Sequence, residues 1–206
     1  MHAVIQRRPL RRALFVMVGV AASVAGLTIT HAQQGPVGVQ DPAWAPDGKH
    51  IAVSYLDRLW IMTPEGKQPR PVTTGEGAIE REPAWSADGS KIAFAADHGT
   101  GFDIFVVTLK NGAPVGTPIA VTSTEGDERW PSWTNDGRIV FAHRNAPAAG
   151  HNGDASLQYD LFLTRPASAP DAWEPAIALT ETTDSETYPR VSPDGTKVAF
   201  VSERDN

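Results

Sequence analysis

The sequence of 206 residues contains no cysteine and only 18 basic residues against 24 acidic ones. Without cysteine there is no disulfide scaffold, thiolate zinc site, cysteine nucleophile or lipid anchor on cysteine. Sustained apolar periodicity of 3.6 residues is also missing beyond the first 32 residues, which argues against a helical protein. What is abundant is glycine and proline, 18 and 17 residues, and 41% of the chain is apolar. This composition is typical of strands joined by turns around a core.

Sequence patterns of common catalytic and metal sites are lacking as well. There is no Gly-x-Ser-x-Gly nucleophile motif and no glycine-rich phosphate loop between a strand and a helix. The histidines show no short ligand spacing; they are His2, His31, His50, His98, His143 and His151. A metal site beside the insertion Asn145–Gln158 is an alternative to a plain surface loop there. We predict no catalytic residue, metal or cofactor in this chain.

The first 32 residues have the order of a secretory signal. Four arginines, Arg7, Arg8, Arg11 and Arg12, precede an uncharged run over 13–29, and Thr30 and Ala32 precede a possible cleavage point. We predict a signal peptide over 1–32, then a linker over 33–40. An uncleaved anchor is the alternative, although the run is short for a span of about 20 residues. Arg11-Arg12 also leaves twin-arginine export open.

Cleavage would make the protein strongly acidic. It removes four arginines and no acid, so 14 basic and 24 acidic residues remain, a net charge of −10. Nucleic acid and anionic membrane surfaces are poor partners for such a chain, because both require clustered positive charge. We therefore expect a periplasmic or secreted protein without a stable membrane span.

The remainder is an internal repeat. Four segments align: Asp41-Pro-Ala-Trp-Ala-Pro-Asp-Gly48, Glu82-Pro-Ala-Trp-Ser-Ala-Asp-Gly89, Trp130-Pro-Ser-Trp-Thr-Asn-Asp-Gly137 and Tyr188-Pro-Arg-Val-Ser-Pro-Asp-Gly195. Their glycines lie 41, 48 and 58 residues apart. A period near 41 that grows by loop insertion fits the four-stranded blades of a β-propeller, which are about 40–45 residues long.

Each unit indicates the same four strands. A short first strand ends in an Asp-Gly turn, where aspartate can bond the backbone locally and glycine can adopt positive φ. The second strands alternate large with mostly small residues, so that neighbouring sheets could nest; they span 51–55, 92–96, 139–143 and 198–202. We expect third strands at 59–62, 104–107 and 161–164, and fourth strands at 72–73, 119–122 and 177–180. Trp44, Trp60, Trp85 and Trp133 are interpreted as equivalent packing residues.

This pattern resembles the PD40 (WD40-like) repeat. The matching elements are Pro-x-Trp, Asp-Gly, Ile-Ala-Phe and a later Asp-Ile-Phe strand, and the resemblance covers residues 41–206 in units starting near 41, 82, 130 and 188. Such repeats form the propeller of the periplasmic protein TolB. They also form propellers attached to prolyl-oligopeptidase-like peptidases, tricorn-type proteases and exported amidohydrolases. The resemblance implies an all-β propeller with about 3.5 blades present, and it is unspecific for function because the motif builds turns and cores.

Two explanations fit the incomplete fourth unit. The chain is either part of a protein with a ring of six or seven blades, which we favour, or it dimerises to complete a ring. The first functional hypothesis is an exported, non-catalytic module that binds a protein or ligand. The second is the amino-terminal propeller of an exported hydrolase, an amidohydrolase or serine peptidase, whose catalytic domain follows residue 206. A lyase or sugar-binding propeller is a weaker third.

Charged residues recur just before each first strand, and in a propeller they would gather near one rim of the channel. They are Glu80, Arg81, Glu82, Asp127, Glu128, Arg129, Asp184 and Glu186. As a binding site they would form a charged funnel for a cation, a peptide amine or a partner protein. As ordinary loop residues they would form exposed ion pairs that each contribute roughly 0–1 kcal/mol.

Overall fold

The computed structural model describes residues 38–75, 77–144 and 158–204. The predicted signal peptide, most of the linker and all of the 145–158 insertion except Gln158 lie outside these ranges. The described residues are all-β. None of their elements is a helix of the length and hydrophobicity needed to cross a membrane.

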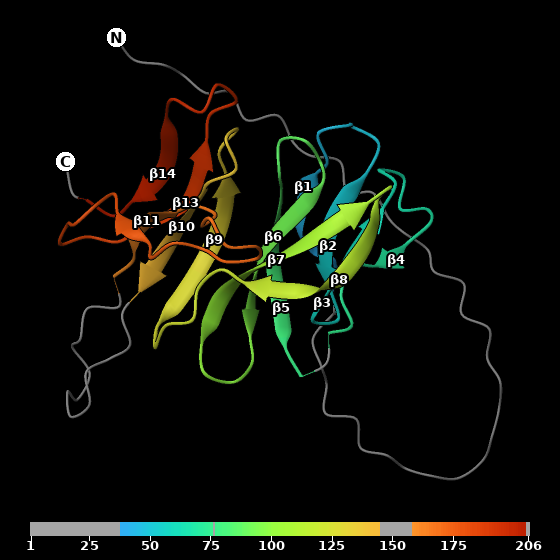
Figure 1. Cartoon of the computed structure of the whole chain (residues 1–206), viewed down its shortest axis with the longest axis horizontal. Coiled ribbons are helices and arrows are strands. Elements are labelled where there is room, and N and C mark those ends of the chain that lie inside the picture. The colour runs from blue at the N-terminus through green and yellow to red at the C-terminus, as the bar shows by residue number, and fades with distance from the viewer. Residues whose placement is uncertain (1–37, 76, 145–157, 205–206) are drawn as a thin grey trace, which may run out of the picture. The chain divides into compact units, whose positions relative to one another are not determined.

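The strands form three antiparallel sheets of four strands and one of two, each in chain order (Figure 1). Sheet 1 contains β1 (Gln40–Trp44), β2 (Ile51–Tyr55), β3 (Arg58–Met62) and β4 (Arg70–Pro71). Sheet 2 contains β5 (Ile79–Trp85), β6 (Lys91–Asp97), β7 (Phe102–Lys110) and β8 (Ala113–Ala120). Sheet 3 contains β9 (Asp127–Trp133), β10 (Ile139–Arg144), β11 (Asp160–Thr164) and β12 (Ile177–Ala178). Sheet 4 contains β13 (Glu186–Val191) and β14 (Val198–Ser202).

Successive sheets lie side by side through their first strands. The first strand of each sheet contacts the first three strands of the sheet before it, as β5 does with β1, β2 and β3. Figure 1 shows the same order as a progression of colour from sheet 1 to sheet 4. The four repeats of the sequence are therefore four neighbouring sheets.

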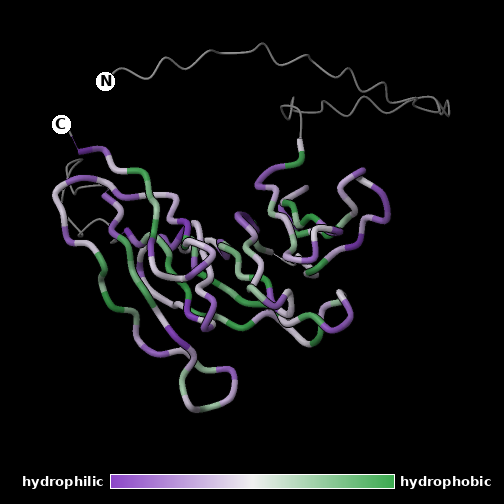
Figure 2. Tube along the Cα trace, turned by 90° about the horizontal axis from the view of Figure 1, so that it is seen from above, coloured by the Kyte–Doolittle hydropathy of each residue, from purple (hydrophilic) through white to green (hydrophobic). Residues whose placement is uncertain are grey.

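The predicted alternation of large and small residues explains how the sheets nest. On β6, Phe94 belongs to the core cluster shared with sheet 1, where Ala52 is buried. The opposite face of β6 carries Ala93 and Ala95, which pack in the cluster that contains Phe141 of sheet 3. The bulky face of one sheet thus packs on the thin face of the sheet before it. Figure 2 shows hydrophobic residues along the strands and hydrophilic residues in many of the connections.

The Asp-Gly turns have the predicted chemistry. Gly48, Gly89, Gly137 and Gly195 all have positive φ, between 65° and 84°. The aspartate before Gly89 accepts the backbone N–H of Ser90 at 3.0 Å and the hydroxyl of Ser86 at 2.7 Å. These hydrogen bonds lower the pKa of Asp88 to about 2, because they stabilise the charged carboxylate.

The fourth strands differ from the prediction. In sheet 1 the last strand is Arg70–Pro71 and excludes Val72-Thr73, and β8 and β12 end before Thr122 and Thr180. At these ends a side chain replaces a backbone carbonyl as the acceptor for one N–H of the third strand. In sheet 1 the N–H of Leu59 donates to Glu80 Oε2 at 2.9 Å. The hydroxyl of Thr122 accepts the N–H of Ile104 at 2.8 Å, and that of Thr180 accepts the N–H of Leu161 at 2.8 Å.

Tryptophan side chains link successive first strands. The indole N–H of Trp85 donates to the carbonyl of Ala43 at 3.1 Å, and that of Trp133 donates to the carbonyl of Ala84 at 3.0 Å. Trp44 occupies the same position in sheet 1 and is 60% exposed. The expectation that Trp60 is equivalent to these three is wrong, since Trp60 lies on the third strand, β3.

Candidate functional site

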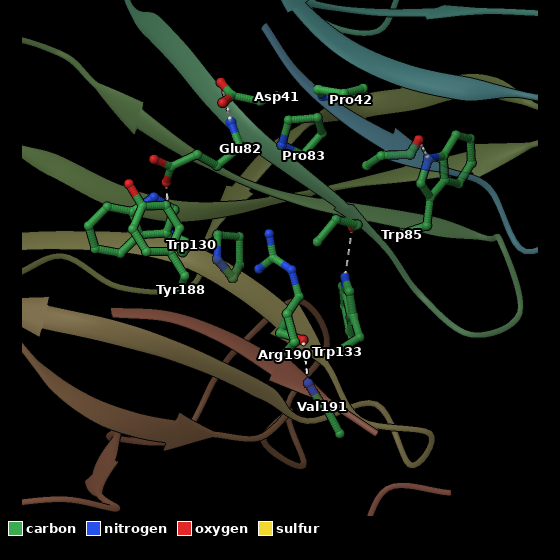
Figure 3. A pocket seen from close by; sticks show the side chains of 14 residues that line it. Asp41, Pro42, Glu82, Pro83, Trp85, Trp130, Trp133, Tyr188, Arg190 and Val191 are labelled. Carbon is green, nitrogen blue, oxygen red and sulfur yellow. Dashed lines mark hydrogen bonds between the residues drawn. The ribbon is translucent and has the colours of Figure 1, made fainter. Parts of the chain in front are cut away.

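The first strands of all four sheets line one cavity of about 370 Å³, which we call the axial cavity (Figure 3). Each first strand has an irregular register with its neighbour just before the repeat's tryptophan or valine. At that bulge a residue other than glycine has positive φ: Asp41 at 51°, Glu82 at 58°, Trp130 at 54° and Tyr188 at 53°. All four precede a proline and line the cavity.

This conformation is uncommon for residues with a side chain. It costs of order 1 kcal/mol at each position, and such strain is concentrated at functional sites. Here the positive φ recurs in all four repeats, so it is a regular feature of the repeat unit. Its consequence is that the residue before each proline lines the cavity, and two of these residues are acidic and two are aromatic.

Hydrogen bonds connect the bulges of the first three sheets. The N–H of Glu82 donates to Asp41 Oδ2 at 3.3 Å, and the N–H of Trp130 donates to Glu82 Oε2 at 2.8 Å. The guanidinium of Arg129 also donates to both carboxylate oxygens of Glu82, from Nε at 3.1 Å. Figure 3 shows the Glu82 carboxylate directed toward Trp130.

The guanidinium of Arg129 is stabilised in its charged form. Burial acts to lower the pKa of Arg129, but pairing with Glu82 raises it above its ordinary value. The guanidinium carbon also lies 4.2 Å from the centre of the Phe102 ring. Because bidentate pairs are strong and directional, Arg129 holds Glu82 in place.

The other side of the axial cavity is aromatic and basic. The rings of Trp130 and Tyr188 lie 4.3 Å apart, centre to centre, and Tyr159 approaches Trp130 edge-on at 5.1 Å. Tyr188 is 51% exposed, and Arg190 beside it is also exposed. The exposed Tyr188 and Arg190 and the half-buried Trp130 belong to the residue types that dominate binding energy at protein interfaces.

Three of the predicted rim residues lie in the contacts between sheets. Glu80, Glu128 and Glu186 are 4%, 0% and 0% exposed. Each accepts a threonine hydroxyl from the segment that ends the preceding sheet: Thr73 for Glu80, Thr124 for Glu128 at 2.5 Å and Thr182 for Glu186 at 2.7 Å. Burial raises the pKa of Glu80. These glutamates are neither exposed loop charges nor parts of the axial cavity wall.

The remaining predicted residues are only partly brought together. Arg81 pairs with Asp57 at 2.6 Å, and Asp127 pairs with Arg144. Asp184 accepts the hydroxyl of Thr183 at 3.3 Å. Of the eight predicted residues only Glu82 lines the axial cavity, and Arg129 reaches it by binding Glu82. Any role of the eight in binding stays a prediction.

Our sequence reasoning missed four residues that line this cavity: Asp41, Trp130, Tyr188 and Arg190. A signal was present for the first three, since each stands directly before the proline of its repeat and the residue type varies between repeats. A residue before proline is normally extended, so the sequence gives no reason to expect a left-handed bulge.

Comparisons with known proteins agree on the fold. No protein-family model matches the chain. Its structure is similar to that of a TolB-type protein from Agrobacterium tumefaciens, with a TM-score of 0.62 and 23% identity over 83% of this chain and 56% of that one. It is also similar to a puromycin-hydrolyzing peptidase from Mycobacterium tuberculosis, with a TM-score of 0.55 and 16% identity over 80% of this chain and 25% of that one.

One curated relative matches by sequence. It is the uncharacterized peptidase YuxL of Bacillus subtilis (strain 168), which is 28% identical in an alignment of 119 residues that covers 51% of this chain and 17% of YuxL. The chain therefore spans about half the length of the TolB-type protein and less than a fifth of YuxL. The fold is an all-β, TolB-like propeller arrangement in which the four sheets are blades.

Proposed function

We propose that this chain is an exported propeller module that binds a protein or peptide segment in the axial cavity and has no catalytic role of its own. The observation that carries the proposal is the convergence of four strained bulges on one cavity, with carboxylates on two of them, the half-buried ring of Trp130 on the third, and exposed Tyr188 with the nearby Arg190 on the fourth. A volume of about 370 Å³ suits a few side chains of a partner rather than a folded domain. Export is supported by the charged, apolar and small-residue order of residues 1–32.

A partner recognised here should be sensitive to Tyr188 and Arg190. We would immobilise the full-length chain, expose it to proteins of the exported fraction, and compare the wild type with Tyr188→Ala and Arg190→Ala. Each variant should lose at least about fivefold in affinity for the captured partner, because truncating a central aromatic or arginine anchor typically costs more than about 1 kcal/mol. Arg138→Ala is the matched control, since Arg138 does not line the axial cavity.

Two results would refute this function. One is that the folded wild type captures no partner, and the other is that Arg190→Ala and Arg138→Ala bind equally well. Circular dichroism of each variant establishes that the strands are retained.

The second candidate is the propeller of an exported hydrolase, and the similarity to two proteins named as peptidases favours a peptidase. In that case the axial cavity would position or filter substrate for an appended domain. The coding sequence downstream of Asn206 tests this idea. A Gly-x-Ser-x-Gly motif would indicate a serine peptidase, and a His-x-His motif an amidohydrolase. Further Asp-Gly repeats followed by a stop codon would refute it.

A further inference from the structure

A second cavity, of about 380 Å³, lies on sheet 3 and shares no residue with the axial cavity. Its lining comes from the segment between β8 and β9, from β9, β10 and β11, and from the connection between β11 and β12. We call it the Trp173 pocket. A volume of this size is within the range of small-molecule sites, which combine apolar walls with a few convergent polar groups.

Aromatic rings form much of the apolar wall. Phe162 lies between two other rings, with its centre 6.2 Å from that of Phe141 and 5.0 Å from that of His143. Trp173 adds an indole that packs edge-on against Trp133 at 6.1 Å. Phe162, Trp173 and the adjoining Ala176 are only partly buried against the core cluster, so their remaining surface faces the pocket.

A fully buried carboxylate lies at the polar end. Glu128 accepts the hydroxyl of Thr124 at 2.5 Å and is paired with Nδ1 of His143. Burial acts to raise the pKa of Glu128, but the hydrogen bonds from His143, Thr124 and Asp103 together lower it below its ordinary value. His143 is the strand-pairing partner of Glu128 between β10 and β9. The equivalent glutamates of the neighbouring sheets pair with other residues, Glu80 with Ala96 in sheet 2 and Glu186 with Ser202 in sheet 4. The imidazole is thus specific to sheet 3.

The wall of the pocket carries more acidic than basic side chains. Among the described residues its lining includes two carboxylates, Glu128 and Glu174, and one basic side chain, His143. Glu174 also pairs with Arg165, whose Nε lies 2.6 Å from Glu174 Oε2 but which is not part of the lining. The half-exposed carboxylate of Glu174 is therefore the charged group most accessible to a ligand in the pocket.

We propose that the Trp173 pocket binds an organic cation, an ammonium group attached to an aromatic or similarly flat apolar body. The ring faces of Trp173 and Phe162 carry negative electrostatic potential that attracts a cation, and the Glu174 carboxylate on the lining acts in the same direction. The apolar body gains by leaving water against the aromatic wall. This site is independent of the partner proposed for the axial cavity.

The test uses three probes of the same shape on the full-length chain: 2-phenylethylammonium, neutral 2-phenylethanol and anionic phenylacetate. Calorimetric titration should show that the ammonium binds about tenfold more tightly than the alcohol, and that phenylacetate binds most weakly. Fluorescence of the tryptophans gives a second readout of the same titration.

Variants place the probe in the pocket. Glu174→Gln should weaken binding of the ammonium by about fivefold and leave binding of the alcohol unchanged, because it removes charge and keeps shape. Glu65→Gln makes the same charge change at an exposed residue that does not line the pocket, so affinity should not change. Trp173→Leu should weaken the binding of both the ammonium and the alcohol. The axial-cavity variant Tyr188→Ala should leave the ammonium titration unchanged.

The proposal is overturned if the ammonium does not bind at millimolar concentration, or if 2-phenylethanol binds as tightly. The proposal would also be overturned if Glu174→Gln and Glu65→Gln lost the same affinity for the ammonium, since binding would then reflect only the net negative charge of the chain.

Discussion

Replacing Trp133 by phenylalanine tests how neighbouring sheets are joined. The change keeps an aromatic ring in the contact but removes the indole N–H that donates to the carbonyl of Ala84 at 3.0 Å. A lost hydrogen bond of this kind costs about 1 kcal/mol, and the smaller ring removes some burial in addition. We expect the free energy of unfolding to fall by about 1–2 kcal/mol, measured by urea denaturation with an unchanged m-value.

Trp44→Phe is the matched control. Trp44 has the same place in its repeat, but it is 60% exposed, and its indole N–H donates no hydrogen bond to another of the described residues. An exposed substitution of this kind should change stability by less than about 0.5 kcal/mol. Trp85→Phe should behave like Trp133→Phe, because its indole donates to the carbonyl of Ala43 at 3.1 Å. If all three variants lose the same stability, the linkage between sheets does not depend on these hydrogen bonds.

Three further changes test the turns and the core. Gly89→Val should destabilise by more than about 1 kcal/mol, because φ is +72° there and an added Cβ would lie 3.2 Å from Pro46; a thermal melt equal to the wild type would contradict this. Phe94→Ala should cost about 3–5 kcal/mol in urea denaturation, since the side chain is 1% exposed between two sheets. The pKa of Asp88 is lowered from 3.8 to about 2, so the ionised side chain stabilises the fold at pH values above 3.8. This stabilisation is lost as the pH falls through about 2. The free energy of unfolding of the wild type should therefore exceed that of Asp88→Asn by about 1 kcal/mol at pH 6, after allowance for solvent screening, and by much less at pH 2. A difference in the free energy of unfolding that does not depend on pH would refute the assignment.

The second strands were predictable because their pattern is local. Residues 51–55 and 198–202 form strands with the expected bounds, and the alternation around Phe94 places large and small side chains on opposite faces. The Asp-Gly turns were predictable for the same reason, because the aspartate carboxylate accepts a hydrogen bond from the backbone N–H two residues later. The ends of the fourth strands were not, because side chains distant in the sequence accept N–H groups of the third strands there: the carboxylate of Glu80 and the hydroxyls of Thr122 and Thr180.

The candidate site shows the limit of reasoning from the repeat. The prediction that the charged residues stand just before the first strands is wrong, because all of them except Asp184 lie within β5, β9 and β13. Nor did the sequence indicate that Glu80 and Glu128 are buried between sheets while Glu82 reaches the axial cavity. That difference follows from one bulge, which changes the face on which the next side chains lie. The Trp173 pocket could not be predicted either, because its walls come from segments that are distant along the chain.

Local features of the chain thus specify the repeat, its turns and the nesting of its sheets, because strand periodicity and turn chemistry act over a few residues. Which charges are buried, which residues before proline turn inward, and where cavities form depend on contacts between repeats that lie tens of residues apart. Those contacts exist only once the sheets have packed together.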